Sequence, residues 1–346
     1  MRPGVAALLI MLIIACVFTA SADSLTLTFV GDISIGDAIS SRGHPNSFHS
    51  TVSEKGLHWP FSLVQDILHQ DDLTVANLEG SITGRKKHKD IRHPLVIAPE
   101  FTGILQAGGI DVVNTANNHA LDFFAQGYRD TLAYLDAAGI GHFGTLSPPS
   151  KTGVDRQFIV EAKGVKIGFM GYTYPQDSDL RRIEESAARL RRDGCAIIVL
   201  SLHWGRETHM APSGAQYSFA KRVLEYDIDL IYGHHPHVVQ PIALYEGKPV
   251  LFSAGNFTFG TMSKVDRSTG MFQISYDLSG NKPRLSAVRA IPCVTSGAGD
   301  FRPVPVTDEA QRREIFKKMA FRKPTQGFDT LGECFLDGGE ALFPAE

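Results

Sequence analysis

AIIVLSLHWGRE (residues 196–207) and LIYGHHPH (residues 230–237) are the two stretches that decide the fold. Each begins as a continuous apolar run rich in β-branched residues, which is typical of a strand buried on both faces of a parallel sheet. Helical spacing over Ala215–Tyr226 lies between them, so this part of the chain is predicted to be strand, helix, strand. Each run ends abruptly in residues that bind metals or carry protons. The two stretches therefore predict an α/β fold with its chemistry at the carboxyl ends of the strands.

Four other apolar runs end in the same way. Because strands of a mixed α/β sheet present their carboxyl ends along one edge, we expect all six ends to converge on one pocket. The four runs and their polar ends are Leu25–Val30 with Gly31-Asp32, Leu73–Ala76 with Asn77-Leu78-Glu79, Val112–Ala116 with Asn117-Asn118-His119, and Val250–Ala254 with Gly255-Asn256.

The residue types at these ends form a coherent metal-ligand set. Imidazole, carboxylate and amide groups suit Zn, Mn or Fe, and no thiolate is offered. Taken singly, a Gly-Asp is usually a turn, an Asn pair caps a helix, and a buried histidine is hydrogen-bonded core. Three histidines within four residues are harder to explain by packing alone. We predict one or two divalent ions, with candidate ligands Asp32, Asn77, Glu79, Asn118, His203, His235 and His237.

A metal-dependent hydrolase also needs an acid that is not a ligand, to protonate the leaving group. His119 is the candidate acid, and Asp122, three residues later, is placed to orient its ring if a helix starts here. Glu207, like Glu79, is a candidate ligand, base or orienter of His203. Trp204 either stacks on substrate or packs beside His203. The candidate substrate-binding residues are Asn117, Trp204, His234 and Asn256.

These motifs, in this order, resemble the CapA family of bacterial capsule and poly-γ-glutamate biosynthesis proteins. They are Val30-Gly31-Asp32, Asn77-Leu78-Glu79-Gly80, Asn117-Asn118-His119 with Asp122, His203-Trp204-Gly205 with Glu207, Gly233-His234-His235-Pro236-His237, and Gly255-Asn256-Phe257. The resemblance spans Leu25 to Phe259. It implies a relation to calcineurin-like metallophosphoesterases, and hence a two-sheet mixed β-sandwich flanked by helices in four layers. It also implies work on capsule or polyglutamate at the cell envelope.

The sequence departs from the phosphoesterase pattern at two motifs. Those enzymes usually open with Asp-x-His, whereas Asp32 is followed by Ile33 and Ser34. Their Gly-Asp motif is represented here by Asn77-Leu78-Glu79, so Glu79 would have to supply the bridging carboxylate.

Two functions therefore stay open. One is a metal-dependent hydrolase acting on an ester, phosphoester or γ-glutamyl-type bond. The other is a non-catalytic accessory protein that binds nascent anionic polymer, or a membrane-bound polymer synthase, during export. The missing histidine favours the accessory protein. The retained Asn118, His119 and Asp122 favour the hydrolase, because a binding protein has no need of an acid.

The N-terminus predicts export. Arg2 precedes an apolar run from Val5 to Phe18, and Ala20-Ser21-Ala22 fits a cleavage site, so residues 1–22 are read as a signal peptide. An uncleaved anchor and lipid attachment at Cys16 are the alternatives. The expected location is the periplasm or cell envelope. We expect one domain over residues 23–320 and a C-terminal extension over residues 321–346.

The charge pattern limits the partners. The chain of 346 residues has a formal net charge of −3, so no global basic field argues for nucleic acid. Gly84–His93 carries five Lys or Arg residues and either rims the pocket to attract a polyanion or is an ordinary solvated loop. Ser41–Trp59 is expected to be a flexible lip. Cys195, Cys293 and Cys334 have no metal-site spacing and leave room for one disulfide.

Overall fold

A computed structural model describes residues 24–146, 155–260, 265–320, 327–331 and 339–342. The predicted signal peptide (residues 1–22), Cys16 and Cys334 lie outside these residues, as does most of the predicted C-terminal extension. None of the helices in the described ranges is long and apolar enough to cross a bilayer. The described cysteines, Cys195 and Cys293, are buried free thiols.

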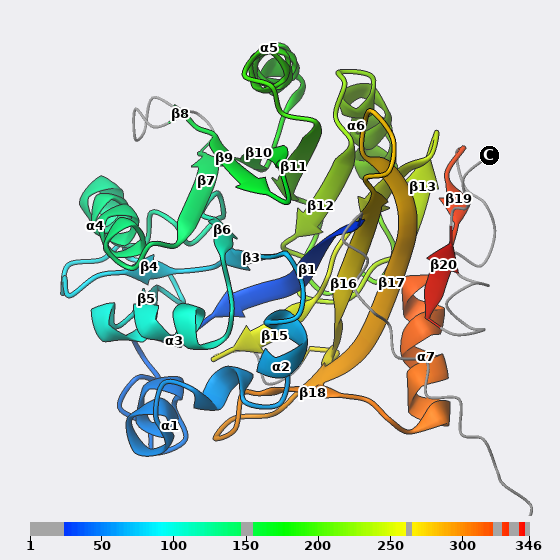
Figure 1. Ribbon diagram of the computed structural model, residues 1–346. Coiled ribbons are helices and arrows are strands. Elements are labelled where there is room, and N and C mark those ends of the chain that lie inside the picture. The colour runs from blue at the N-terminus through cyan, green and yellow to red at the C-terminus, as the bar shows by residue number, and fades with distance from the viewer. Residues whose placement is uncertain (1–23, 147–154, 261–264, 321–326, 332–338, 343–346) are drawn as a thin grey trace, which may run out of the picture.

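One large mixed sheet curls around the main core (Figure 1). In its first half, β1 (Ser24–Ser34) is central and pairs in parallel with β3 (Leu73–Leu78) and β15 (Asn256–Phe259). The parallel run continues through β6 (Val112–Asn114) and β7 (Gly141–Thr145). The antiparallel strands of this half are β16 (Ser268–Asp277), β17 (Arg284–Thr295), β18 (Pro303–Pro305) and β20 (Glu340–Leu342).

The second half contains the two apolar stretches within residues 196–207 and 230–237. Its parallel strands are β10 (Val165–Thr173), β11 (Ile197–His203), β12 (Leu230–His234) and β14 (Lys248–Leu251). Antiparallel strands complete it: β8 (Asp155–Arg156), β9 (Phe158–Ala162), β13 (Ile242–Tyr245) and β19 (Asp329–Thr330). The pairing of Tyr172 with Thr145 joins the two halves through β7.

The inner faces of the two halves pack against each other in one hydrophobic cluster. The rings of Phe29 on β1 and Tyr232 on β12 lie 4.9 Å apart, and the Tyr232 hydroxyl donates to the Val30 carbonyl. The backbones also approach closely. A Cβ on Gly233 would lie 2.1 Å from the Phe252 carbonyl oxygen, so only glycine fits there.

Seven α-helices in the described part of the chain, and one small sheet, surround this curled sheet. Helices α5 (Leu180–Arg192) and α6 (Gly214–Leu224) bury apolar faces against β11 and β12. The remaining helices are α1 (Phe48–Lys55), α2 (Gln65–Leu68), α3 (Thr102–Ala107), α4 (Phe124–Ala137) and α7 (Glu309–Met319). The small sheet contains β2 (Asp37–Ala38), β4 (Ser81–Ile82) and β5 (Leu95–Ile97).

Most predicted elements are present. The apolar runs on either side of Lys163-Gly164 favour a β-hairpin, and this hairpin forms with positive φ at both residues. Two expectations differ. The predicted lip at Ser41–Trp59 contains α1, which begins because the Ser47 hydroxyl accepts from the Ser50 amide. The apolar residues of Pro60–His69 have helical spacing and predict one helix, but that helix is broken because Val64 leaves helical geometry with a φ of −131°. Only a 3₁₀ turn and the short α2 form there.

Candidate metal centre

The strand pairing places four polar residues side by side across β1 and its neighbours. Asp32 is in register with Asn77 on β3 and with Asn256 on β15, and Asn77 is in register with Asn114 on β6. All four side chains are buried. The bulge of β1 lies directly after Asp32. The polar residues expected after the runs that contain β1, β3 and β14 therefore converge in the fold, and Asn256 is at the start of β15.

Asn77 connects Asp32 to a residue that the sequence analysis did not single out. The amide nitrogen of Asn77 donates to Asp32 Oδ1 at 2.9 Å, and its oxygen accepts from Asn114 Nδ2 at 3.0 Å. Both ends of the Asn77 amide are thus occupied within the protein. Asn114 lies inside the predicted strand, so its only sequence signal was a polar residue among apolar neighbours.

The second half of the sheet contributes histidines. His203 on β11 is in register with His234 on β12. The loop after β12 then places His235 and His237 at φ values of +94° and +57°, a conformation that costs free energy for residues other than glycine. Two backbone hydrogen bonds hold the loop after β11 against it, from Trp204 N to His234 O and from Thr208 N to Pro236 O. These bonds bring Glu207 beside the histidines.

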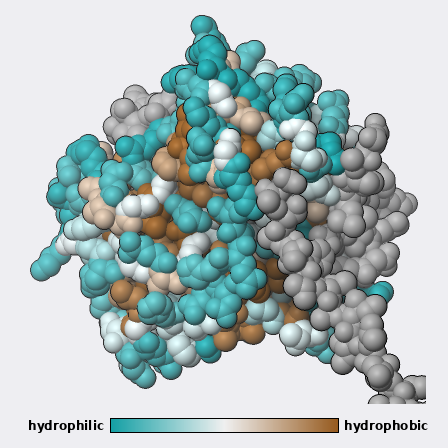
Figure 2. All heavy atoms as spheres, viewed as in Figure 1, coloured by the Kyte–Doolittle hydropathy of each residue, from teal (hydrophilic) through white to brown (hydrophobic). Residues whose placement is uncertain are grey.

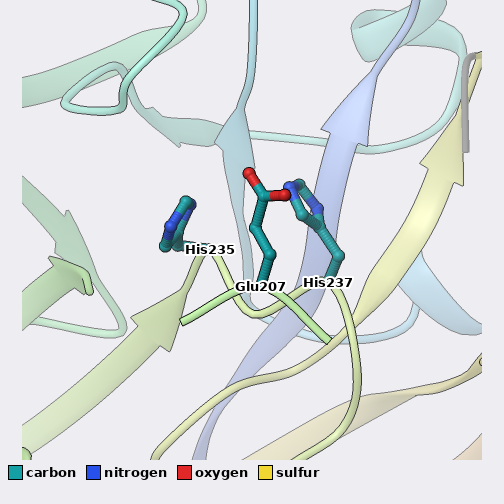
Figure 3. Close-up of side chains that lie close together, drawn as sticks. All are labelled: Glu207, His235 and His237. Atoms are coloured by element: carbon teal, nitrogen blue, oxygen red, sulfur yellow. The ribbon is translucent and has the colours of Figure 1, made fainter. Parts of the chain in front are cut away.

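Two groups of ligand-type side chains result, and they share His237. Asp32, Glu79 and His237 form one, and Glu207, His235 and His237 form the other; within each group the ligand atoms lie within 4.8 Å of one another. In Figure 3 the Glu207 carboxylate lies between the two rings. Glu207 is exposed and the others are buried, so the first group is the enclosed one.

Several buried atoms in this cluster have no hydrogen-bond partner. They include both carboxylate oxygens of Glu79, which is fully buried, and the Nδ1 atoms of His203 and His235. Buried polar atoms are normally paired, because leaving one unpaired costs about 1–3 kcal/mol. A divalent cation held by Asp32, Glu79 and His237 would satisfy the Glu79 oxygens, and one held by Glu207, His235 and His237 would use a His235 nitrogen, so the residues present fit a metal ion.

Hydrogen bonds fix which nitrogen each histidine offers. His237 Nδ1 lies 2.8 Å from Asn256 Oδ1, which can only accept, so Nε2 is the lone-pair nitrogen and lies 3.8 Å from Glu79 Oε1. His203 Nε2 lies 2.9 Å from Asn118 Oδ1, which leaves Nδ1 of His203 as its lone-pair nitrogen. Both rings are therefore held with a free ligand atom.

Burial controls the protonation of the cluster. It lowers the pKa of His235 to about 4, aided by His237, and it lowers the pKa of His203 well below its usual value, aided by His235. Burial, with the charges of Asp32 and Glu207, raises the pKa of Glu79 well above its usual range. Burial would also raise the pKa of Asp32, but contacts with His234 and His237 outweigh it and lower that pKa. The imidazoles are thus held neutral, the form that binds metals.

The predicted acid lies at the edge of the cluster. His119 Nδ1 lies 2.7 Å from Asp122 Oδ2, and the same oxygen accepts from the Leu95 amide at 2.8 Å. A carboxylate only accepts, so Nδ1 carries a proton and Nε2 faces Glu79 Oε1 at 3.8 Å. The His119 side chain is 19% exposed. This ring can therefore exchange a proton with a molecule bound from outside.

The four candidate substrate-binding residues make inward contacts. Trp204 stacks on Phe252 and its indole N–H donates to the Phe252 carbonyl at 3.0 Å. Asn117 bonds the Leu78 carbonyl and the His119 amide, and thereby fixes the loop that carries His119. His234 Nδ1 lies 2.8 Å from Asp32 Oδ1, and Asn256 contacts His237 as described above.

Tyr174 is a site residue that sequence reasoning missed. It follows β10, and its hydroxyl lies 3.1 Å from His235 Nε2. Its ring is 41% exposed and lines a cleft of about 1170 Å³ with Trp204 and Arg206. The available signal was its place just after the apolar run that contains β10, because Asp32 and His203 also lie at the ends of apolar runs.

The fold and the cluster together define an α/β protein with a buried candidate metal centre at the carboxyl ends of its strands. The model of one family, described as Bacterial capsule synthesis protein PGA_cap, matches residues 26–261. That is more than half of the chain, so the protein belongs to this family, as the resemblance to CapA predicted.

Curated relatives agree with this membership. The "PGA biosynthesis protein CapA" of Bacillus subtilis is 31% identical over 89% of this chain and 78% of its own length. The "Capsule biosynthesis protein CapA" of Bacillus anthracis is 26% identical over 86% and 73%. A "Probable polyglutamine synthesis accessory protein" of Mycobacterium tuberculosis is 31% identical over 57% and 59%.

Proposed function

We propose that this protein takes part in the synthesis of capsule or poly-γ-glutamate, and that it does so with a metal-dependent, hydrolase-type site. Family membership and the names of the relatives support the first part. The observation that carries the second part is Glu79. Its two buried, unpartnered oxygens lie beside Asp32 and His237, and a cation is the simplest group to satisfy them.

The site would hold one or two divalent ions, Zn, Mn or Fe. Asp32, Glu79 and His237 would be the inner ligands, with Glu207 and His235 on the open side and His203 close by. An ion held there would lower the pKa of a water molecule to about 7 and polarise an ester, phosphoester or γ-glutamyl carbonyl. His119 would protonate the leaving group from Nε2, with its ring oriented by Asp122.

The same proposal covers the architecture and the location. A two-sheet sandwich of the metallophosphoesterase kind, flanked by helices in four layers, accounts for the two sheet halves and their shared core. An exported protein of the periplasm or cell envelope, with residues 1–22 as its signal peptide, accounts for the apolar N-terminal run.

A non-catalytic accessory protein is the second candidate. Phosphoesterases of the related class carry histidine where this chain has Ser34, whose buried hydroxyl has no partner. Such a protein would bind anionic polymer, or a membrane-bound synthase, and use the metal only for structure. The Mycobacterium tuberculosis relative is named an accessory protein.

Elemental analysis of the purified full chain, paired with a panel of phosphodiester and γ-glutamyl substrates, tests the proposal. We expect at least one divalent ion per chain and metal-dependent turnover of one substrate class. A chain purified without chelators that contains no metal would overturn the metal site. Bound metal without turnover of any substrate would favour the accessory protein.

A further inference from the structure

The connection between β4 and β5 is tied to the residue that orients His119. The Lys89 amide donates to the Asp122 carbonyl at 2.7 Å, and the Leu95 amide donates to Asp122 Oδ2 at 2.8 Å. That same Oδ2 holds His119 Nδ1. The segment Arg85–His93, which we call the basic segment, is therefore fixed beside the candidate acid and does not hang free of the site.

The basic segment is strongly cationic and exposed. It has five Lys or Arg residues and one acid, Asp90, which gives a net charge of +4 in a chain whose total is −3. Arg85 pairs with Asp130, and Lys87 lies over the Phe124 ring. The described residues provide no acidic partner for Lys86, Lys87, Lys89 or Arg92. This segment runs along the left edge of the molecule in Figure 1, and that edge is largely hydrophilic in Figure 2.

An anionic ligand needs such a surface because the site itself is acidic. Asp32, Asp122 and Glu207 lie at or around the candidate metal centre, and in the absence of an ion their carboxylates would repel that of a ligand. Unpaired surface cations raise the local concentration of an anion, and their field is not cancelled by neighbouring acids. An extended polyanion, unlike a small anion, can contact the basic segment and His119 at once.

We propose that the basic segment is the docking surface for an extended polycarboxylate chain, which it delivers to His119. This proposal rests on the proposed function for its choice of carboxylate over phosphate. The hydrogen bond from the Lys89 amide to Asp122, and the exposed Lys86, Lys87 and Arg92 on the same segment, carry the rest.

The test uses the full chain and a poly-γ-glutamate of defined length, with binding measured at low and high salt. The variant Lys86→Glu/Arg92→Glu alters two exposed side chains of the segment. Its control is Lys282→Glu/Arg313→Glu, which also changes one exposed lysine and one exposed arginine that form no ion pair within the described residues. Arg313 is on α7, on the opposite side of the molecule in Figure 1.

We expect the segment variant to bind about tenfold more weakly or worse at low salt, the control to bind within about twofold of wild type, and wild-type affinity to fall as salt rises. Equal affinities for the two variants would overturn the docking surface. Equal or tighter binding of a single-stranded DNA of the same charge would overturn the assignment to a carboxylate polymer.

Metal content is measured on the same samples, so that the two proposals can fail separately. A wild-type chain that lacks metal but shows the expected binding pattern would sink the metal site and support the docking surface. A metal-loaded chain with no salt-dependent binding of the polymer would overturn the docking surface and support the metal site.

Discussion

At the scale of single residues, the site divides into atoms that face a ligand and atoms that hold other side chains. Glu79, His203, His235 and His237 each keep at least one buried atom free of protein hydrogen bonds or aimed at another ligand. Asn77, Asn117 and Asn256 use their amides on neighbours. Substitutions in the first set should weaken metal binding, whereas substitutions in the second set should displace the side chains that these amides hold.

His119 and His235 are expected to fail in different ways. His119→Ala should keep its metal and lose about 10²- to 10⁴-fold in turnover on the substrate that the panel identifies, because a general acid contributes that much. His235→Ala should lose both metal and turnover. Elemental analysis and initial rates check this, with the exposed His58→Ala as control. A His119→Ala chain of normal activity would remove the acid from the mechanism.

Tyr174 is expected to support His235 as an outer partner. Tyr174→Phe removes the hydroxyl that lies 3.1 Å from His235 Nε2. Loss of such a partner typically weakens metal affinity about 10- to 100-fold. Competition for the metal ion with a chelator of known affinity measures this change in affinity. Tyr134→Phe on α4, which is also exposed, is the matched control and should leave the affinity unchanged.

The lowered pKa of His235 predicts a pH dependence of stability. Its pKa is about 4 in the folded chain and 6.5 in the unfolded chain, so the unfolded chain takes up the proton first as pH falls. Folding is therefore weakened between about pH 6.5 and pH 4, by up to about 3 kcal/mol for this group. Urea unfolding of chelated wild type and His235→Gln at pH 7.5 and 4.5 isolates the effect. Identical pH dependence in both would contradict it.

At the scale of elements, the site depends on where strands end and how closely their backbones approach. The β11 and β12 ends lie side by side because the strands pair up to His203 and His234, and Thr208 then bonds the loop after β12. The positive φ values of His235 and His237 persist because the bonds from Thr208 to Pro236 and between His237 and Asn256 hold that loop.

Substitution of Gly233 tests the close approach of backbones around β12. In Gly233→Ala the new Cβ would lie 2.1 Å from the Phe252 carbonyl oxygen, so β12 or its neighbour must move. We expect about 2 kcal/mol or more of lost stability, together with weaker metal binding, since His234 and His235 follow directly. Gly214→Ala at the start of α6 meets no atom within 4 Å and should be neutral. Denaturant unfolding of both variants and of the wild type measures these changes in the free energy of unfolding.

At the scale of the whole molecule, the candidate metal centre joins the two halves of the curled sheet. Asp32 and Glu79 come from the β1 and β3 side, and His237 and Glu207 come from the loops after β12 and β11. An ion bound between them would crosslink segments far apart in the chain.

Metal removal should therefore destabilise the entire fold. A ligand that binds only the folded chain adds about 2.7 kcal/mol to the free energy of unfolding at a free concentration of 100 times its Kd. Thermal unfolding of chelated and Mn- or Zn-reconstituted protein should show a higher midpoint with metal. The His235→Ala chain should show little of this gain. An equal gain in that variant would mean that the stabilising ion does not use His235 as a ligand.

The family, the α/β class and the strand ends followed from the sequence alone. Alternation and continuous apolar runs report burial along one strand, and a polar residue after such a run marks its end, so Asp32, Glu79, His203 and His237 were found without coordinates. Only the tertiary structure could show that Asn77 bonds Asn114, that Tyr174 reaches His235, and that the basic segment is anchored at Asp122. These contacts join residues 37, 61 and 33 positions apart, and no local pattern encodes a distance that the packing of separate strands creates.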